Sequence, residues 1–304
     1  MDSRELGLVL ARLLLDVEDL HYGWWAEGDA PSLAGLADAQ RRHSELLLDA
    51  VAGLLRIPTS FAADVDAPRV LDIGCGTGAL AAKANQRGWA CDGLVPSALL
   101  ADWARTRLAE WPQRRVLECR LEDAGDHTSP DTYDAAYFSE SFQYVDLDAG
   151  LRALATLLKP SAAVVVFDAF ARDDAPPGKA PIGGGHRLST ALEAFRRHGF
   201  ELIDDVDHSP HLAPNLDLLQ ALLRDRLRPS AMALDAYLMA QHGLLWRGFK
   251  WLQRRRLDKL DSRWGTSREA ATFLRWKSYR LQRFRLTAGA RTRHAVQNDR
   301  HDSR

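Results

Sequence analysis

The chain has 304 residues, is 46% hydrophobic and carries a formal net charge of −1, enough for one large α/β domain with additions or two small domains. No apolar run reaches the roughly 18 residues of a membrane helix, and residues 1–7 lack a signal-peptide pattern. Its three cysteines, Cys75, Cys91 and Cys119, show neither metal-ligand spacing nor a disulfide framework. We therefore expect no membrane span, no bound metal and a reducing, cytoplasmic setting.

Residues 1–60 are predicted to form a helical N-terminal cover. Apolar residues recur at helical spacing over residues 6–20, and a second amphipathic helix is predicted to begin at Ser32 and to stop before Pro58. Between them, the aromatic segment 21–25 contains the adjacent Trp24 and Trp25. Both cannot face the core of one helix or strand, so one is expected to cover a pocket, with ordinary core packing as an equal alternative.

Strands then alternate with helices over residues 61–208, which predicts a doubly wound, parallel α/β core. The predicted strands are 69–73, 89–94, 116–119, 133–138, 163–167 and 200–206, and the helices between them span 79–86, 97–110, 148–159 and 189–198. Residues 209–277 are helical in character and are predicted to be an insertion that covers the substrate. Residues 278–287 read as a seventh, antiparallel strand or as a basic helix, and 288–304 as a disordered tail.

The chain is organised around a glycine turn that follows the first predicted strand. Gly74, Gly76 and Gly78 lie at alternate positions, where bare backbone and a helix N-terminus can approach a ligand. These glycines alone also fit a dinucleotide fingerprint. Asp72 at the end of the strand, however, suits a cationic amine and would repel a pyrophosphate.

The run from Val70 to Gly78 resembles the first motif, V-L-D-I-G-C-G-T-G, of the class I S-adenosylmethionine (SAM)-dependent methyltransferases. The resemblance implies a Rossmann-like, mostly parallel seven-stranded sheet, with the methionine end of SAM in the turn. The segment from His21 to Trp24 is similar to one that closes over the cofactor in small-molecule members. The cofactor-binding residues implied are Tyr22, Asp72, Gly74, Cys75, Gly76, Thr77, Gly78, Val95, Ser97, Leu121, Glu122 and Ser139.

Two positions depart from this family's pattern. Val95 stands where the family has the acid that grips the ribose hydroxyls, and Arg120 replaces the first acid of the adenine segment. Asp92 lies three residues before Val95, so strand alternation points it to the opposite face and it cannot substitute.

The segment after the fourth strand is expected to lie beneath the transferred methyl group. Methyl transfer depends mainly on in-line placement, although an oxygen nucleophile can need a base. The candidate bases are His21, Glu140 and His186, and the candidate substrate-binding residues are Trp24, Trp25, Gln143 and His186. A lone histidine is more often a packing or surface residue than a base.

The sequence therefore predicts methyl transfer from SAM to the oxygen, nitrogen or carbon of a small organic molecule of natural-product or lipid type. Residues 244–293 carry fifteen Lys or Arg against three acids, which is compatible with an anionic carrier or partner. A nucleic-acid methyltransferase is a rival, although the Asn/Asp-Pro-Pro-Tyr/Phe motif is missing after the fourth strand. A methyltransferase-like binding protein without turnover, a nicotinamide enzyme and a homodimeric assembly also stay open.

Overall fold

The computed structural model describes residues 9, 12–13, 17–19, 21–55, 67–178, 180–261 and 269–287. The strands are β1 (Arg69–Ile73), β2 (Ala90–Leu94), β3 (Val116–Leu117), β4 (Tyr133–Ser139), β5 (Leu158–Ala171), β6 (Phe200–Asp207) and β7 (Lys277–Leu286). The helices are α2 (Leu36–Leu54), α3 (Ala79–Gln86), α4 (Ala98–Arg107), α5 (Leu147–Leu157), α6 (Leu188–Arg197), α7 (Ser209–Leu212), α8 (Pro214–Leu222), α9 (Arg228–Asp261) and α10 (Ala270–Trp276). The predicted order of strands and helices is thus confirmed.

The seven strands form one mixed sheet in the order β3-β2-β1-β4-β5-β7-β6. Strands β1 to β5 pair in parallel, whereas β7 lies antiparallel between β5 and β6. The chain leaves β6 at Asp207, opposite Arg280 of β7, so the insertion begins and ends at the same edge of the sheet. Because the chain re-enters the sheet at that edge, β7 must run opposite to β6, and the strand interpretation of residues 278–287 is correct.

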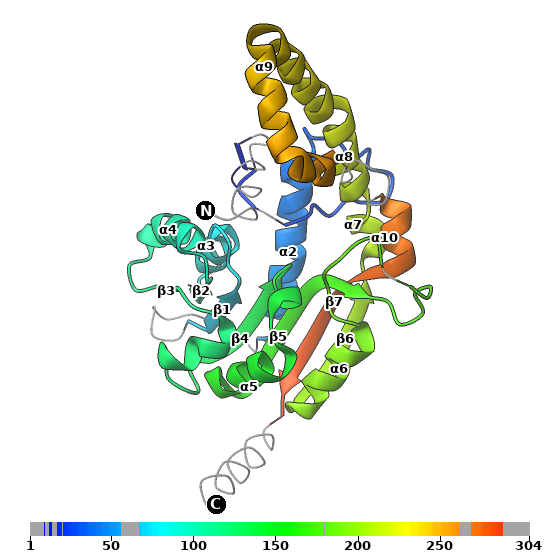
Figure 1. The fold of residues 1–304 in the computed structure, drawn as a ribbon. Helices are drawn as coiled ribbons and strands as arrows, with labels where there is room; N and C mark the ends of the chain where they lie inside the picture. Colours follow the sequence, from blue (N-terminus) through cyan, green and yellow to red (C-terminus); the bar gives the residue numbers. More distant parts are fainter. Residues whose placement is uncertain are drawn as a thin grey trace, which may run out of the picture.

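Helices cover both faces of the sheet (Figure 1). One hydrophobic cluster joins α5 and α6 to one face through Leu151, Leu154 and Phe195. A second joins α2 and α3 to the other through Leu47 and Leu80, and also includes residues of α7, α8 and α10. Consequently the N-terminal helix and the insertion share a core with the sheet.

Helix boundaries follow their caps. The predicted cap Ser97 accepts a hydrogen bond from the backbone N–H of Leu100, whereas α5 is capped by Asp146, two residues before the predicted start. Helix α2 begins at Leu36 rather than at Ser32. Most of the predicted helix at 6–20 and all of the tail at 288–304 fall outside the described residues. Within the described ranges, no helix combines the length and apolar character that crossing a membrane requires.

The insertion ends in a long element that departs from the body. Helix α9 contains a break at His242, whose φ of −137° and ψ of 37° are not helical. Figure 1 shows that the chain reverses in α9, so that its two limbs form a hairpin projecting beyond α8 and away from the sheet.

Candidate active site

The glycine turn after β1 has the backbone conformation that its residues permit. Gly74, Gly76 and Gly78 have φ of 78°, 54° and 77°, which residues with a Cβ rarely adopt. A Cβ at Gly74 would lie 2.3 Å from the Cβ of Ser141, and one at Gly78 would lie 2.9 Å from the Cα of Ala104. A side chain at Gly74 would therefore collide with the protein itself.

The carboxyl group of Asp72 is buried beside this turn. It is 1% exposed, and burial raises its pKa to about 8, against a lowering contribution from the hydrogen bond with Tyr137. Its Oδ2 has no hydrogen-bond partner among the described residues. An unpaired buried acceptor is costly, so this oxygen is suited to a donor that arrives with a ligand.

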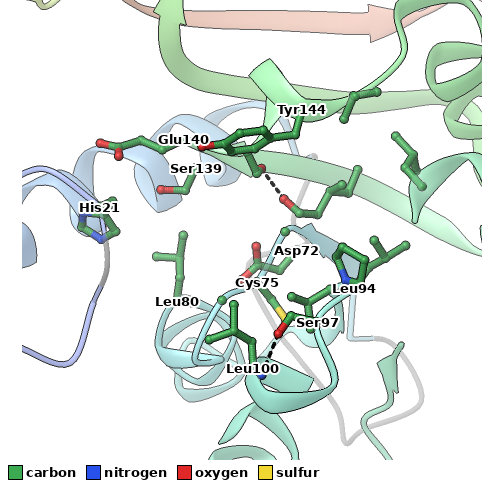
Figure 2. Close-up of a pocket in the computed structure, with 18 of the residues that line it drawn as sticks. His21, Asp72, Cys75, Leu80, Leu94, Ser97, Leu100, Ser139, Glu140 and Tyr144 are labelled. Carbon is green, nitrogen blue, oxygen red and sulfur yellow. Dashed lines mark hydrogen bonds between the residues drawn. The ribbon is translucent and has the colours of Figure 1, made fainter. Parts of the chain in front are cut away.

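A cavity of about 1000 Å³ runs from the turn to the ends of β2 and β4. Figure 2 shows Asp72, Cys75 and Ser97 on one side, and Glu140 and Tyr144 on the opposite side. The lining residues include Asp19, His21, Asp72, Gly74, Cys75, Gly76, Thr77, Val95, Ser97, Arg120, Leu121, Glu122, Ser139, Glu140, Gln143 and Tyr144. The fold thus gathers most of the residues predicted from the sequence.

Val95 lies in the cavity wall and is 3% exposed, so no carboxylate stands at this point. Asp92 does not replace it, because it faces away and accepts hydrogen bonds from Arg115 Nη2 at 3.1 Å and from Tyr133 Oη at 3.0 Å. The nearby Ser97 hydroxyl already accepts the N–H of Leu100. Asp92 therefore bonds to neighbouring side chains of the protein and points away from the cavity, as strand alternation predicted.

The segment after β3 forms another wall of the cavity. Burial favours a higher pKa for Glu122, but the backbone N–H groups and the Arg120 guanidinium outweigh it and lower that pKa. Glu122 Oε1 accepts the N–H of Asp146 at 2.8 Å. Glu122 is consequently an ionised hydrogen-bond acceptor in the cavity wall. It lies two residues after Arg120, one of the two positions that depart from the family's pattern.

Glu140 is a half-buried acid at the other end of the cavity. Its Oε1 accepts the N–H of Tyr22 at 2.7 Å and the phenol of Tyr279 at 2.7 Å. Burial raises its pKa to about 7, while these two donors lower it and nearby Asp168 raises it further. A carboxyl group with this pKa can accept a proton near neutral pH.

Sequence reasoning missed Tyr279, which lies on β7 and comes 139 residues after Glu140. It also missed Asp168, a 1%-exposed acid on β5 that accepts the N–H of Gln143 at 3.2 Å. Burial raises the pKa of Asp168 to about 7. The available signals were an acid directly after the predicted strand 163–167 and a tyrosine within the predicted strand 278–287, because buried polar groups need partners.

The N-terminal cover is fastened over the turn by polar contacts. Gln40 of α2 donates to the carbonyls of Asp19 at 3.0 Å and His21 at 2.7 Å. Lys83 of α3 lies 2.5 Å from the Asp19 carboxylate, and Thr77 donates to the carbonyl of residue 18 at 3.0 Å. As a result, Gln40 and Thr77 hold the cover against the glycine turn.

Several predicted residues lie elsewhere within the described structure. Trp24 stacks on His211 with ring centroids 4.3 Å apart, and buried Trp25 donates to Asn215 Oδ1 at 3.2 Å. Thus both tryptophans contact the start of the insertion and neither lines the described cavity. His186 packs against Phe142 outside that lining, and Tyr22 contributes its backbone N–H to Glu140.

These residues fit a nucleoside that carries a cationic amino group. The unpaired Asp72 oxygen supplies an acceptor for an ammonium group, and the unpaired Ser139 hydroxyl adds a second polar group in the wall. The volume suits a bound small molecule, since such sites measure roughly 300–1,000 Å³. The donor set therefore fits SAM in the orientation implied by the turn.

A family model described as a methyltransferase domain matches residues 71–164. No curated protein matches the chain. Many solved structures are similar to it, among them the following three. The (4+2)-cyclase SpnF has a TM-score of 0.64 and 20% identity, with 94% of this chain and 96% of that chain covered. Geranyl diphosphate C-methyltransferase from Streptomyces coelicolor A3(2), in complex with Mg²⁺, geranyl-S-thiolodiphosphate and S-adenosyl-L-homocysteine, has a TM-score of 0.62 and 17% identity, covering 91% of each chain.

The cyclopropane synthase MmaA2 from Mycobacterium tuberculosis has a TM-score of 0.59 and 18% identity, with 88% of this chain and 90% of that chain covered. At these identities the structures show a common fold, and the domain match lies over the strands that build the cavity. Residues 71–164 are therefore a methyltransferase domain, and the chain around them has the fold of these solved structures.

Proposed function

We propose that this enzyme transfers the methyl group of SAM to a small organic molecule with an apolar body. The observation that carries this proposal is the continuity of the cavity, which leads from the unpaired Oδ2 of Asp72 to the carboxyl group of Glu140. Geranyl diphosphate, named for one structural neighbour, is a small molecule with an apolar chain. The acceptor can be oxygen, nitrogen or carbon.

When bound, SAM supplies an activated methyl group on a sulfonium. Asp72 would hold the amino group of its methionine part, with backbone N–H groups of the turn near the carboxylate. Leu121 and Glu122 would face the adenosine part, while Val95 leaves the ribose without the family's acid. The remaining predicted contacts, including Thr77 and Ser97, belong to the same proposal.

Glu140 is the strongest of the three base candidates. It lines the cavity, is half-buried and has a pKa of about 7. His21 also lines the cavity, but burial lowers its pKa, and His186 lies outside the described lining. Glu140 would accept a proton from the acceptor group, while Gln143 beside it would orient the substrate.

The test combines binding with turnover. Calorimetry should show saturable SAM binding, and NADH should not compete. Mass spectrometry of ligands that co-purify with the protein should then identify a compound that gains 14 mass units in the presence of SAM. Saturable NADH binding in place of SAM would overturn the proposal.

A second candidate is a SAM-binding protein that catalyses no methyl transfer. It is favoured by Val95, since the missing acid removes two charge-assisted hydrogen bonds to the ribose. The neighbour SpnF, named as a cyclase, has the same fold. Binding of SAM without S-adenosylhomocysteine formation on any co-purified compound would support this candidate.

The homodimer, the anionic carrier and the cytoplasmic location remain predictions. So does the role of residues 209–277 as a substrate cover, since none of the residues that line the described cavity comes from this insertion. A nucleic acid is a weaker candidate, since the cavity carries no excess of basic lining residues.

A further inference from the structure

The two limbs of α9 form a hairpin with its own internal contact. Trp246 donates its indole N–H to Asp235 Oδ1 at 2.8 Å, which joins positions on either side of the break at His242. In Figure 1 the hairpin extends away from the sheet beyond α2 and α8. Its outer part therefore has room to meet a large partner without moving the catalytic body.

Large apolar side chains are exposed on both limbs of this hairpin. Met232, Leu234 and Tyr237 on the first limb are 64%, 58% and 60% exposed, and Trp251 and Leu252 on the second are 76% and 72% exposed. Single exposed apolar residues are ordinary, but a group of them on one projecting element is typical of an interaction surface. Burying these side chains in an apolar region of a partner would lower the free energy.

The same element is basic. Residues 243–261 contain six Lys or Arg and two Asp, so the second limb carries a clear positive charge. A second copy of this surface would bring like charges together, which disfavours a hairpin-to-hairpin dimer. The partner that complements the hairpin must be both anionic and able to bury aromatic and aliphatic side chains.

We propose that the α9 hairpin docks the enzyme on the surface of a lipid bilayer that contains anionic headgroups. The net positive charge of the second limb would favour the anionic headgroups, while Trp251, Leu252 and the apolar side chains of the first limb would enter the boundary with the acyl chains. A nucleic acid satisfies the charge but offers no hydrocarbon for Met232 and Leu234. The docking does not depend on which acceptor is methylated, so it can fail while the proposed function stands.

The experiment is co-sedimentation of the full chain with vesicles of phosphatidylcholine alone and with vesicles that also contain phosphatidylglycerol. Binding is expected only to the second kind and should fall steeply with added salt. The double variant W251S/L252S should bind at least tenfold more weakly. Because both side chains are largely exposed, its thermal midpoint and SAM affinity should stay unchanged.

A matched control is Ile203→Ser on β6, since Ile203 is also exposed, at 47%, but lies on the body. This variant should bind vesicles like the wild type. The charge variant R254Q/R255Q/R256Q should lose binding to anionic vesicles at low salt. No vesicle binding, equal binding to neutral vesicles, or undiminished binding of W251S/L252S would overturn the proposal. Tighter binding to RNA or to an acidic protein than to anionic vesicles would overturn it as well.

Discussion

The phenol of Tyr279 donates a hydrogen bond to Oε1 of Glu140 across 2.7 Å, which joins the last strand of the sheet to the end of β4. His43 Nε2 lies 3.3 Å from the same phenol oxygen. The carboxyl of Glu140 is thereby held in one orientation at the cavity wall. A donor of this kind stabilises the ionised carboxylate and so sets the pH at which Glu140 can accept a proton.

Tyr279→Phe should therefore raise the pKa of Glu140 above its value of about 7. Loss of a charge-assisted hydrogen bond predicts an increase of roughly one to two pH units. The measurement is a ¹³C NMR titration of the Glu140 carboxyl, assigned with Glu140→Gln. Tyr133→Phe is the control, because Tyr133 donates to Asp92. An unchanged titration in Tyr279→Phe would show that the phenol does not govern Glu140.

SAM binding at pH 7 should release close to one proton. Burial raises the pKa of Asp72 to about 8, so the carboxyl is mostly protonated before the ligand arrives, and the ammonium group of SAM favours its ionised form. Calorimetry in two buffers of different ionisation enthalpy measures this release. In Asp72→Asn the release should disappear, and the affinity should fall by about 10- to 100-fold. Proton release that persists in Asp72→Asn would show that a group other than Asp72 loses the proton when SAM binds.

Gly74→Ala should destabilise the fold more than Gly88→Ala, although both glycines have positive φ, at 78° and 83°. A Cβ at Gly88 meets nothing within 4 Å, so only the backbone cost of about 1 kcal/mol applies. At Gly74 the collision with Ser141 should add roughly 1–3 kcal/mol. Urea unfolding measures both. Equal losses would mean that the turn and Ser141 separate easily.

Asp92→Asn should lower stability on the order of 2 kcal/mol while leaving SAM affinity unchanged. Loss of one partner in a buried ion pair costs roughly 3–5 kcal/mol, and the cost is smaller here because the Arg115 side chain is 40% exposed. Urea unfolding and SAM calorimetry test the two parts separately. A selective loss of SAM affinity would instead make Asp92 the missing ribose acceptor.

Stability should fall as the pH drops below about 6.5, and His43 should contribute to this fall. Burial, followed by the neighbouring His21, His208 and Lys83, lowers the pKa of His43 well below 6.5. Below pH 6.5 the unfolded chain therefore binds a proton at His43 and the folded protein does not. This lowers the free energy of unfolding by on the order of 1 kcal/mol one pH unit below 6.5. Urea unfolding at pH 7 and pH 5.5 should show a smaller drop for His43→Phe than for the wild type. The exposed control His127→Phe should keep the wild-type drop.

The strand and helix order was predictable because each element carries its own local pattern. The apolar run of Arg69–Ile73, the glycines after it and the cap at Ser97 each specify structure over a few residues, and all were located correctly. The antiparallel direction of β7 could also be predicted, because an insertion that leaves and re-enters a sheet at the same edge forces it.

The wall around Glu140 depended on contacts between residues that are distant in the chain. Tyr279, Asp168 and the fastening of the cover by Gln40 come from separate elements, and no spacing rule joins them. The placement of Trp24 and Trp25 against the insertion was likewise beyond local patterns. The sequence by itself determined the glycine turn after β1 and the layered α/β fold, since both rest on short-range periodicity and glycine conformation. Only the tertiary structure decided which buried polar groups meet, because packing brings their elements together.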